Sequence, residues 1–224
     1  MRLFQLNKIV LNFQNNAEKF LSGLTTNTLD RPKNAFVTVH GRIVATFDQI
    51  KISDDEYWAV MENSAHAPLL KHLENFLRLN KTEVKLLEKK VYFDLECDCP
   101  FVPGDYSISQ NRGKLLITER HLTPNVSEEE FTLFRLGNNI PLQGVDYTDQ
   151  LLLNVNDEDY VSYTKGCFLG QEPIAKVHNR SQPTWKLAVR FEDELTDEEK
   201  SKMTSKIPDP PTGRVLGFVF VKNS

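Results

Sequence analysis

The chain has 224 residues, 40% of them hydrophobic and 26% charged, and a formal net charge of −4. This length suits one large domain or two small ones, and the negative charge argues against nucleic acid as the main partner, since nucleic-acid binding needs a basic surface. No apolar run is long enough to cross a bilayer, and residues 1–16 lack the apolar core of a secretory signal, so we expect no membrane partner and a cytoplasmic location.

The cysteines and histidines form neither a disulfide framework nor a metal-binding pattern. There are three cysteines, an odd number, and five scattered histidines. Cys97 and Cys99 form an isolated C-x-C pair with no second pair at metal-binding spacing. A structural zinc site needs four ligands, so we predict no stable metal site.

A helix and a β-hairpin are the first elements that the pattern predicts. Residues 15–24 have helical character, with Asn15 as the cap, Glu18 three positions later and Gly23 as the stop. Residues 35–53 are rich in Val, Ile, Thr and Phe with His-Gly-Arg near the centre, which is typical of a β-hairpin.

A third strand, a second helix and further strands follow. Residues 56–61 read as a strand, and residues 83–96 suggest more strands. Between them, residues 66–79 predict a helix because four apolar residues share one face: Leu69, Leu73, Phe76 and Leu77.

The middle of the chain predicts a long loop, a strand and short helices. Residues 96–113 hold two prolines and two glycines, which favours a loop around a tight turn, and residues 113–120 read as a strand. Residues 127–137 open with a Ser-x-x-Glu capping box and predict a helix. Two short helical pieces are expected at 148–153 and 157–162.

The C-terminal part predicts strand, helix and strand. Residues 185–191 and 214–221 read as strands, separated by a helix that begins at a Thr196–Glu199 capping box and by a rigid turn at 208–213. About forty residues are too few for an independent core, so we expect this tail to pack on the main body. The whole pattern is that of an α+β protein.

The most unusual stretch is KGCFLGQEPIAK, residues 165–176. Gly166 and Gly170 permit backbone angles that other residues avoid, and Pro173 is harmless in the first turn of a helix. We therefore predict a tight loop through residue 170, followed by a helix.

Cys167 in this loop has two interpretations. Lys165 and the free N–H groups at the start of the predicted helix favour a reactive thiolate. Cysteine is also common as a small buried hydrophobic residue, and this alternative stays open. His178 lies eleven positions further along the same helix and would point away, so we do not expect it to act as a base for the thiol.

The motif resembles the signature of the YgfZ-type proteins, which are folate-binding relatives of the glycine-cleavage T-protein (aminomethyltransferase) associated with iron–sulfur cluster assembly and repair. Three further segments, 20–29, 39–47 and 134–146, are similar to that family, so that the resemblance covers about residues 1–190. The residues that match the motif are Lys165, Gly166, Cys167, Phe168, Gly170, Gln171 and Glu172, with Lys176 where Arg is usual.

The resemblance implies a fold and a ligand. The expected fold is α+β, with small lobes packed as a cloverleaf around a central channel that in the relatives holds a reduced folate. We expect a folate-binding domain over residues 1–185 and a shortened, β-rich C-terminal remnant over residues 186–224 packed on it. The implied cofactor is tetrahydrofolate or a derivative, and the implied protein partners are iron–sulfur client or assembly proteins.

The resemblance also implies the residues of the site, with Cys167 as the key residue and Lys165 beside it. Several residues of the implied site have an ordinary structural alternative. Residues 25–27 can form a polar helix end, Arg42 can be a solvated turn residue, and a Lys165–Glu172 ion pair can serve only to fix the loop. The implied folate-binding residues are Thr25, Thr26, Asn27, Arg42, Gly166, Gly170, Gln171, Glu172 and Lys176.

Two departures from the T-protein argue against aminomethyl transfer. Its pteridine-binding glutamate falls at Gly137 in an ungapped comparison, and its aspartate falls at Cys167. The expected function is therefore a folate-binding accessory protein of iron–sulfur assembly or repair. The alternatives are a folate-dependent aminomethyltransferase of glycine cleavage and a binding module that has lost folate.

Overall fold

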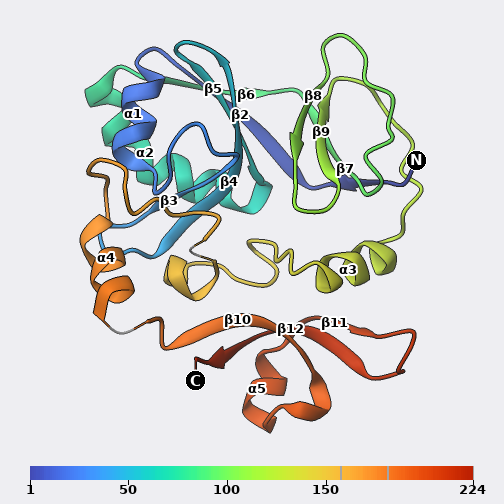
Figure 1. The fold of residues 1–224 in the computed structure, drawn as a ribbon. Helices are drawn as coiled ribbons and strands as arrows, with labels where there is room; N and C mark the ends of the chain where they lie inside the picture. Colours follow the sequence, from blue (N-terminus) through green and yellow to red (C-terminus); the bar gives the residue numbers. More distant parts are fainter. Residues whose placement is uncertain (157, 181, 224) are drawn as a thin grey trace.

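The computed structural model describes residues 1–156, 158–180 and 182–223, and these form a mixed α+β fold with three antiparallel sheets (Figure 1). We call the sheets, each with the helices packed on it, the first, second and third lobes; β1 belongs to the second lobe although it comes first in the chain. In the part of the chain described, no helix is long and apolar enough to cross a membrane.

The first lobe is a sheet with the strand order β3-β4-β5-β2-β6, covered on one face by α1 (Ala17–Leu24) and α2 (His66–Asn80) (Figure 1). Alternate residues of a strand face opposite sides of its sheet. Leu11 accordingly packs against the helices, whereas Val10 faces the second lobe. The strands are β2 (Lys8–Gln14), β3 (Lys33–Val37), β4 (Ile43–Ser53), β5 (Glu56–Glu62) and β6 (Glu83–Leu87).

The second lobe is a sheet with the order β1-β7-β9-β8, on which α3 (Glu128–Gly137) packs. Phe131 of α3 stacks on Phe4 of β1, with ring centroids 4.1 Å apart. This cluster continues into Val10 and Val60 of the first lobe, so the two lobes share a core. The strands are β1 (Leu3–Leu6), β7 (Lys90–Asp94), β8 (Tyr106–Ser109) and β9 (Lys114–Thr118).

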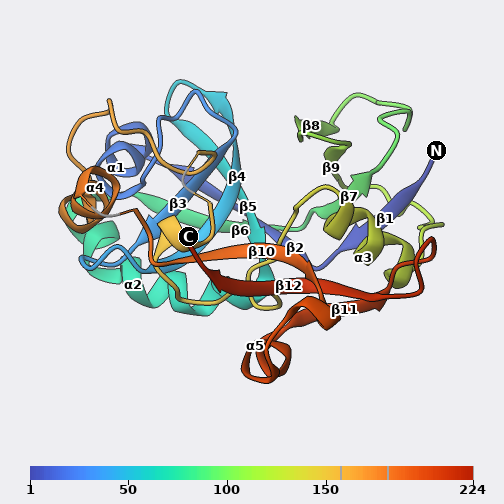
Figure 2. The same ribbon diagram turned by 60° about the horizontal axis from the view of Figure 1, so that its bottom comes forward.

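The third lobe lies below the other two in Figure 1 and carries α5 (Asp197–Lys202) on its outer side (Figure 2). Its sheet has the order β10-β12-β11. Leu187 and Phe218 pack against a cluster that includes Val37 and Ile174, which attaches the sheet to the main body. The strands are β10 (Trp185–Phe191), β11 (Thr204–Pro208) and β12 (Val215–Lys222).

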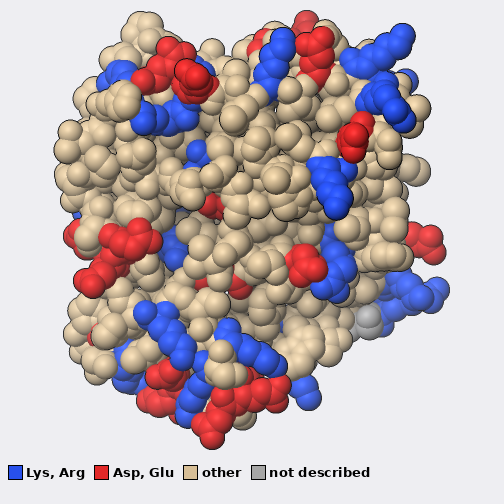
Figure 3. All heavy atoms as spheres, turned by 180° about the vertical axis from the view of Figure 1, so that it is seen from behind, with Lys and Arg blue, Asp and Glu red and all other residues tan. Residues whose placement is uncertain are grey.

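Charged side chains of both signs intermix over the third lobe, at the bottom of the rear view in Figure 3. Arg214 bonds to Asp193 and Glu194, and Lys206 pairs with Glu192. Such exposed ion pairs contribute about 0–1 kcal/mol each. The buried contacts of the sheet therefore hold this lobe in place.

A long connection and α4 (Gln171–Arg180) join the second lobe to the third. The connection crosses beneath the first lobe and contains one 3₁₀ turn at Leu152–Asn154 (Figure 1). Another 3₁₀ turn, Asn63–Ala65, precedes α2.

Most predicted elements are confirmed. The predicted cap of α1 is wrong: Asn16 occupies the cap position without a side-chain hydrogen bond, and Asp55 accepts from the backbone N–H groups of Asn16 and Glu18. Gly23 lies inside that helix rather than after it.

The loop predicted at 96–113 contains β8, and the strands β1, β2 and β11 were not predicted. Two short helical pieces were predicted. In place of the first, at 148–153, the chain forms the 3₁₀ turn Leu152–Asn154. Of the second, at 157–162, residue 157 lies outside the described residues and residues 158–162 form no helix. The predicted division of the chain after residue 185 stays a prediction, although β10 begins at Trp185.

Candidate functional site

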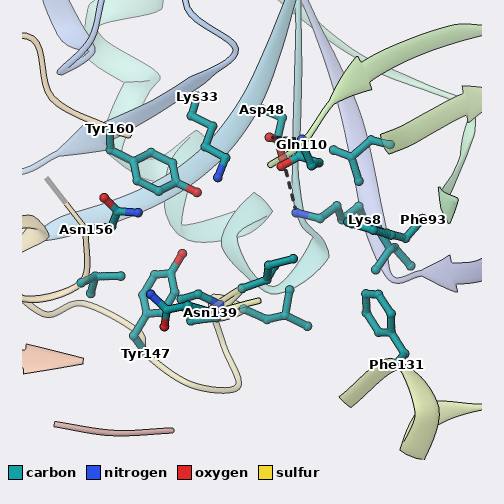
Figure 4. Close-up of a pocket in the computed structure, with 16 residues that line it drawn as sticks. Lys8, Lys33, Asp48, Phe93, Gln110, Phe131, Asn139, Tyr147, Asn156 and Tyr160 are labelled. Carbon is teal, nitrogen blue, oxygen red and sulfur yellow. Dashed lines mark hydrogen bonds and ion pairs between the residues drawn. The ribbon is translucent and has the colours of Figure 1, made fainter. Parts of the chain in front are cut away.

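A cavity of about 60 Å³ lies where the first lobe, the second lobe and the connection meet (Figure 4). Strand ends and loops supply its walls, so its residues are far apart in the sequence. The polar side chains of its lining include Lys8, Lys33, Asp48, Gln110, Tyr147 and Tyr160.

One wall carries a buried charge network. The Nζ atom of Lys8 lies 3.0 Å from a carboxylate oxygen of Glu62 and 4.0 Å from one of Asp48, and Gln110 Nε2 donates to Asp48 Oδ1 at 2.9 Å. Burial alone would lower the pKa of Lys8, but the attraction of Glu62 and Asp48 outweighs burial and raises that pKa. Lys8 therefore stays charged at neutral pH, and Asp48 is already engaged by two partners.

The opposite wall carries two phenols and a second lysine, which point into the same space in Figure 4. Burial raises the pKa of both Tyr147 and Tyr160 well above the ordinary value, so both phenols are neutral hydrogen-bond donors. The hydroxyl of Tyr147 lies 2.6 Å from Thr46 Oγ1, and Lys33 pairs with Asp159 at 3.0 Å.

The cysteine loop, residues 165–170, docks on the end of α1. Lys165 Nζ donates to the carbonyl oxygens of Thr25 at 2.6 Å and Asn27 at 2.9 Å, and Leu169 N donates to Gly23 O at 3.1 Å. The last carbonyls of a helix have no partner within it, so the loop supplies donors to carbonyls at and just beyond the end of α1.

Lys165 is a half-buried cation without a matching anion. No carboxylate pairs with it among the residues that the structure describes, and its ammonium lies 5.2 Å from the ring centre of Phe168. Burial lowers the pKa of Lys165 to about 8. Lys165 therefore does not form the ion pair with Glu172 that was the structural alternative, and its ammonium instead donates to two backbone carbonyls.

Gly170 has a positive φ of 81°, and a Cβ atom there would lie only 2.4 Å from Thr38 O. The predicted tight loop thus requires glycine at this position. The predicted helix follows as α4, with Pro173 in its first turn. Gly166, by contrast, has open space around its Cα atom.

Cys167 is exposed and borders a surface pocket of about 370 Å³, which also includes Ser22, Gly23 and Lys165. This pocket shares no lining residue with the central cavity. The interpretation of Cys167 as a buried hydrophobic residue is wrong, since the side chain is exposed to solvent.

Thr25, Thr26 and Asn27 lie between the cysteine loop and the central cavity and are 0% exposed. The backbone carbonyls of Thr25 and Asn27 hold Lys165 on one side, whereas on the other side Thr26 Oγ1 donates to Tyr160 O at 2.6 Å. Asn27 Nδ2 donates to Asp159 O at 2.9 Å and to Lys33 O at 3.0 Å. This three-residue segment, the bridging segment, connects the two sites without lining either.

The other predicted residues lie elsewhere. Arg42 is 51% exposed in its side chain, pairs with Asp149 at 3.3 Å and does not line the central cavity. Glu172 and Lys176 are exposed on α4, and Gln171 begins that helix. Their proposed folate-binding roles stay predictions.

The sequence interpretation missed the cavity-lining residues Lys8, Lys33, Asp48, Tyr147 and Tyr160. The available signal was a charged residue inside an apolar strand, such as Asp48 within the sequence VATFDQI. A buried charge requires partners and marks a special site. The partners of Asp48 are distant in the sequence, which hid the site.

Comparison with known proteins identifies the fold. No family model matches the chain. An uncharacterised protein of Haemophilus influenzae is 22% identical over 177 residues; the match covers 73% of this chain and 63% of the relative, so this chain spans less than two thirds of the relative's length. A crystal structure of glycine cleavage system aminomethyltransferase T from Bartonella henselae matches with a TM-score of 0.75 and 12% identity, over 98% of this chain and 78% of that one. The chain therefore has the α+β fold of aminomethyltransferase T.

Proposed function

We propose that this chain is a YgfZ-type accessory protein that binds a reduced folate and supports the assembly or repair of iron–sulfur clusters in client enzymes. The central observation is the bridging segment Thr25–Asn27, which connects the wall of the central cavity to the loop that carries Cys167. The matched fold and the KGCxxGQE motif support the same proposal. The proposed folate-binding domain is residues 1–185, the remnant is residues 186–224, and the proposed location is the cytoplasm.

The chemistry of the central cavity suits the polar pterin ring of a folate. Its walls carry neutral phenols at Tyr147 and Tyr160, an ammonium at Lys33 and the carboxamides of Asn139 and Asn156. A few precisely placed polar groups among apolar side chains are typical of small-molecule sites.

The volume of the cavity requires it to open before a folate enters. About 60 Å³ holds roughly four water molecules, whereas ligand sites typically measure about 300–1,000 Å³. The walls come from different lobes, but Phe131 belongs to the core that the two lobes share, so opening the cavity would break apolar contacts in that core. The same small volume is the observation that favours the second candidate, a binding module that has lost folate.

Aminomethyl transfer is less well supported. Positions 137 and 167 carry no acid, and the carboxylate that faces the cavity, Asp48, is held by Lys8 and Gln110. Formation of methylenetetrahydrofolate from an aminomethylated lipoyl donor would instead support the transferase.

Calorimetric titration with tetrahydrofolate under anaerobic conditions tests the ligand. We expect binding to the wild type, and about two- to tenfold weaker binding to Tyr160→Phe, which loses one hydroxyl facing the cavity. Tyr163→Phe is the matched control, because Tyr163 is partly exposed and does not line the cavity. No binding to the wild type would favour the module that has lost folate.

Genetic complementation tests the process. In a strain that lacks the protein, wild-type chain should restore the activity of iron–sulfur enzymes and Cys167→Ala should not. Cys97→Ala is the matched control, since Cys97 is also exposed but lies in the second lobe. Full complementation by Cys167→Ala would contradict the role proposed for the thiol.

A further inference from the structure

A second hollow, the α2 groove, lies between the start of α2, the start of β4 and residues 143–149. Its volume is about 730 Å³, which is within the range of small-molecule sites. It shares no lining residue with the central cavity or the Cys167 pocket. The α2 groove is therefore separate from the proposed folate site.

The α2 groove is preformed by a turn that is fixed to β4. Gln143 Oε1 accepts from Thr46 N at 2.8 Å, and Gln143 Nε2 donates to Val44 O at 3.0 Å. Gly144 has a φ of 85°, and a Cβ atom there would lie 2.5 Å from Ser64 Oγ. The turn thus packs closely against the residues before α2, and a ligand would not have to order it.

The body of the groove is apolar. Ile43 and Val44 from β4 and Ala65 and Pro68 near the start of α2 supply aliphatic surface. His72 lies at the same wall, and burial lowers its pKa, so its imidazole is neutral at neutral pH. These groups suit a flat apolar ligand body.

The rim of the groove has an unpaired positive charge. Lys71 is exposed and forms no ion pair with any residue in the described part of the chain, whereas Asp149 is engaged by Arg42 at 3.3 Å. Together with Arg42, which lies outside the groove and neutralises Asp149, these three side chains sum to one positive charge, and the ammonium of Lys71 is the one that attracts an anionic group.

We propose that the α2 groove binds a small amphipathic anion, with a flat apolar body in the groove and one acidic group beside Lys71. Apolar surface supplies the affinity, and the single cation at the rim fixes the orientation of the ligand. Neither the cysteine loop nor the bridging segment takes part.

Fluorescence titration with anilinonaphthalene sulfonate, an apolar ring system with one sulfonate, tests the proposal. Lys71→Glu reverses the charge at the rim, and we expect binding to weaken at least about tenfold, a change of about 1.4 kcal/mol. Lys19→Glu is the matched control, since Lys19 is an exposed lysine on α1 outside the groove, and its affinity should stay within about twofold of the wild type.

A second variant tests the groove itself. Pro68→Asp places a negative charge on the wall, in the first turn of α2, where an acidic residue favours the helix, so that folding is preserved. It should also weaken binding of the probe at least about tenfold. Equal affinity for the wild type, Lys71→Glu and Pro68→Asp, or equal weakening by Lys19→Glu, would overturn the proposal.

Discussion

Lys165 combines three properties that seldom occur together in a lysine. It is half-buried, it donates to two backbone carbonyls rather than to a carboxylate, and its pKa is lowered to about 8 by burial. At neutral pH the residue is therefore mostly charged but close to releasing its proton. Because it lies two positions before Cys167, its protonation state bears on the charge around the thiol.

The pH dependence of stability tests this view of Lys165. Between pH 8 and 10.5 the folded chain has released this proton while the unfolded chain keeps it, so the free energy of unfolding gains a contribution that rises with pH. Relative to Lys165→Met, the wild type should gain stability as pH rises through this window, by at most about 1.4 kcal/mol per pH unit. Urea unfolding of both proteins at the two ends of the window measures it. A constant difference would show that the amine titrates normally.

At the scale of elements, the cysteine loop depends on close packing against the hairpin of β3 and β4. Gly170 approaches Thr38 O, and a Cβ atom at Gly41 would lie 3.2 Å from Ile174. The hairpin, the loop and α4 therefore fit together only when both turn positions lack a side chain.

Replacing Gly170 with alanine should destabilise the protein by about 1–3 kcal/mol, because the new Cβ atom meets a backbone oxygen at a positive φ. Gly166→Ala is the matched control in the same loop, where nothing lies within 4 Å, and its effect should stay within about 1 kcal/mol. Denaturant unfolding compares the two. Equal losses of stability would contradict the packing described for this loop.

The sequence predicted those elements whose signals are local. The β3–β4 hairpin, α2 and the capping boxes at Ser127 and Thr196 each depend on residues within a few positions of one another. The cap of α1 escaped prediction because Asp55 reaches it from a different loop. The same reason applies to the central cavity: Lys8, Asp48 and Gln110 meet only after the first two lobes have packed together.

At the scale of the whole molecule, a buried polar network attaches the third lobe to the rest. Arg135 of α3 donates to Asp146 at 2.7 Å, and Asp146 accepts from the hydroxyls of Thr204 and Ser205 at 2.9 and 2.6 Å. Arg135 also donates to Ser205 at 2.9 Å. The connection and β11 are therefore held by one carboxylate and one guanidinium.

Asp146→Ala should be strongly destabilising, by about 3–5 kcal/mol, because it leaves the buried Arg135 without its anion. The double variant Arg135→Met with Asp146→Ala should lose less than the sum of the two single changes, since the residues act as one pair. Urea unfolding of the set measures the coupling. Simple additivity would show that the network does not hold the third lobe.

We expect a ligand in the central cavity and the thiol of Cys167 to be coupled through the bridging segment, whose residues bond to the cavity wall on one side and to Lys165 on the other. The most direct measurement is the rate at which iodoacetamide modifies Cys167, with and without saturating tetrahydrofolate, resolved by peptide mass spectrometry. We expect the ligand to change the rate at Cys167 at least about fivefold and to leave exposed Cys97 unchanged in the same sample. An unchanged modification rate at Cys167, under conditions where calorimetry shows bound tetrahydrofolate, would contradict the coupling between the cavity and the thiol.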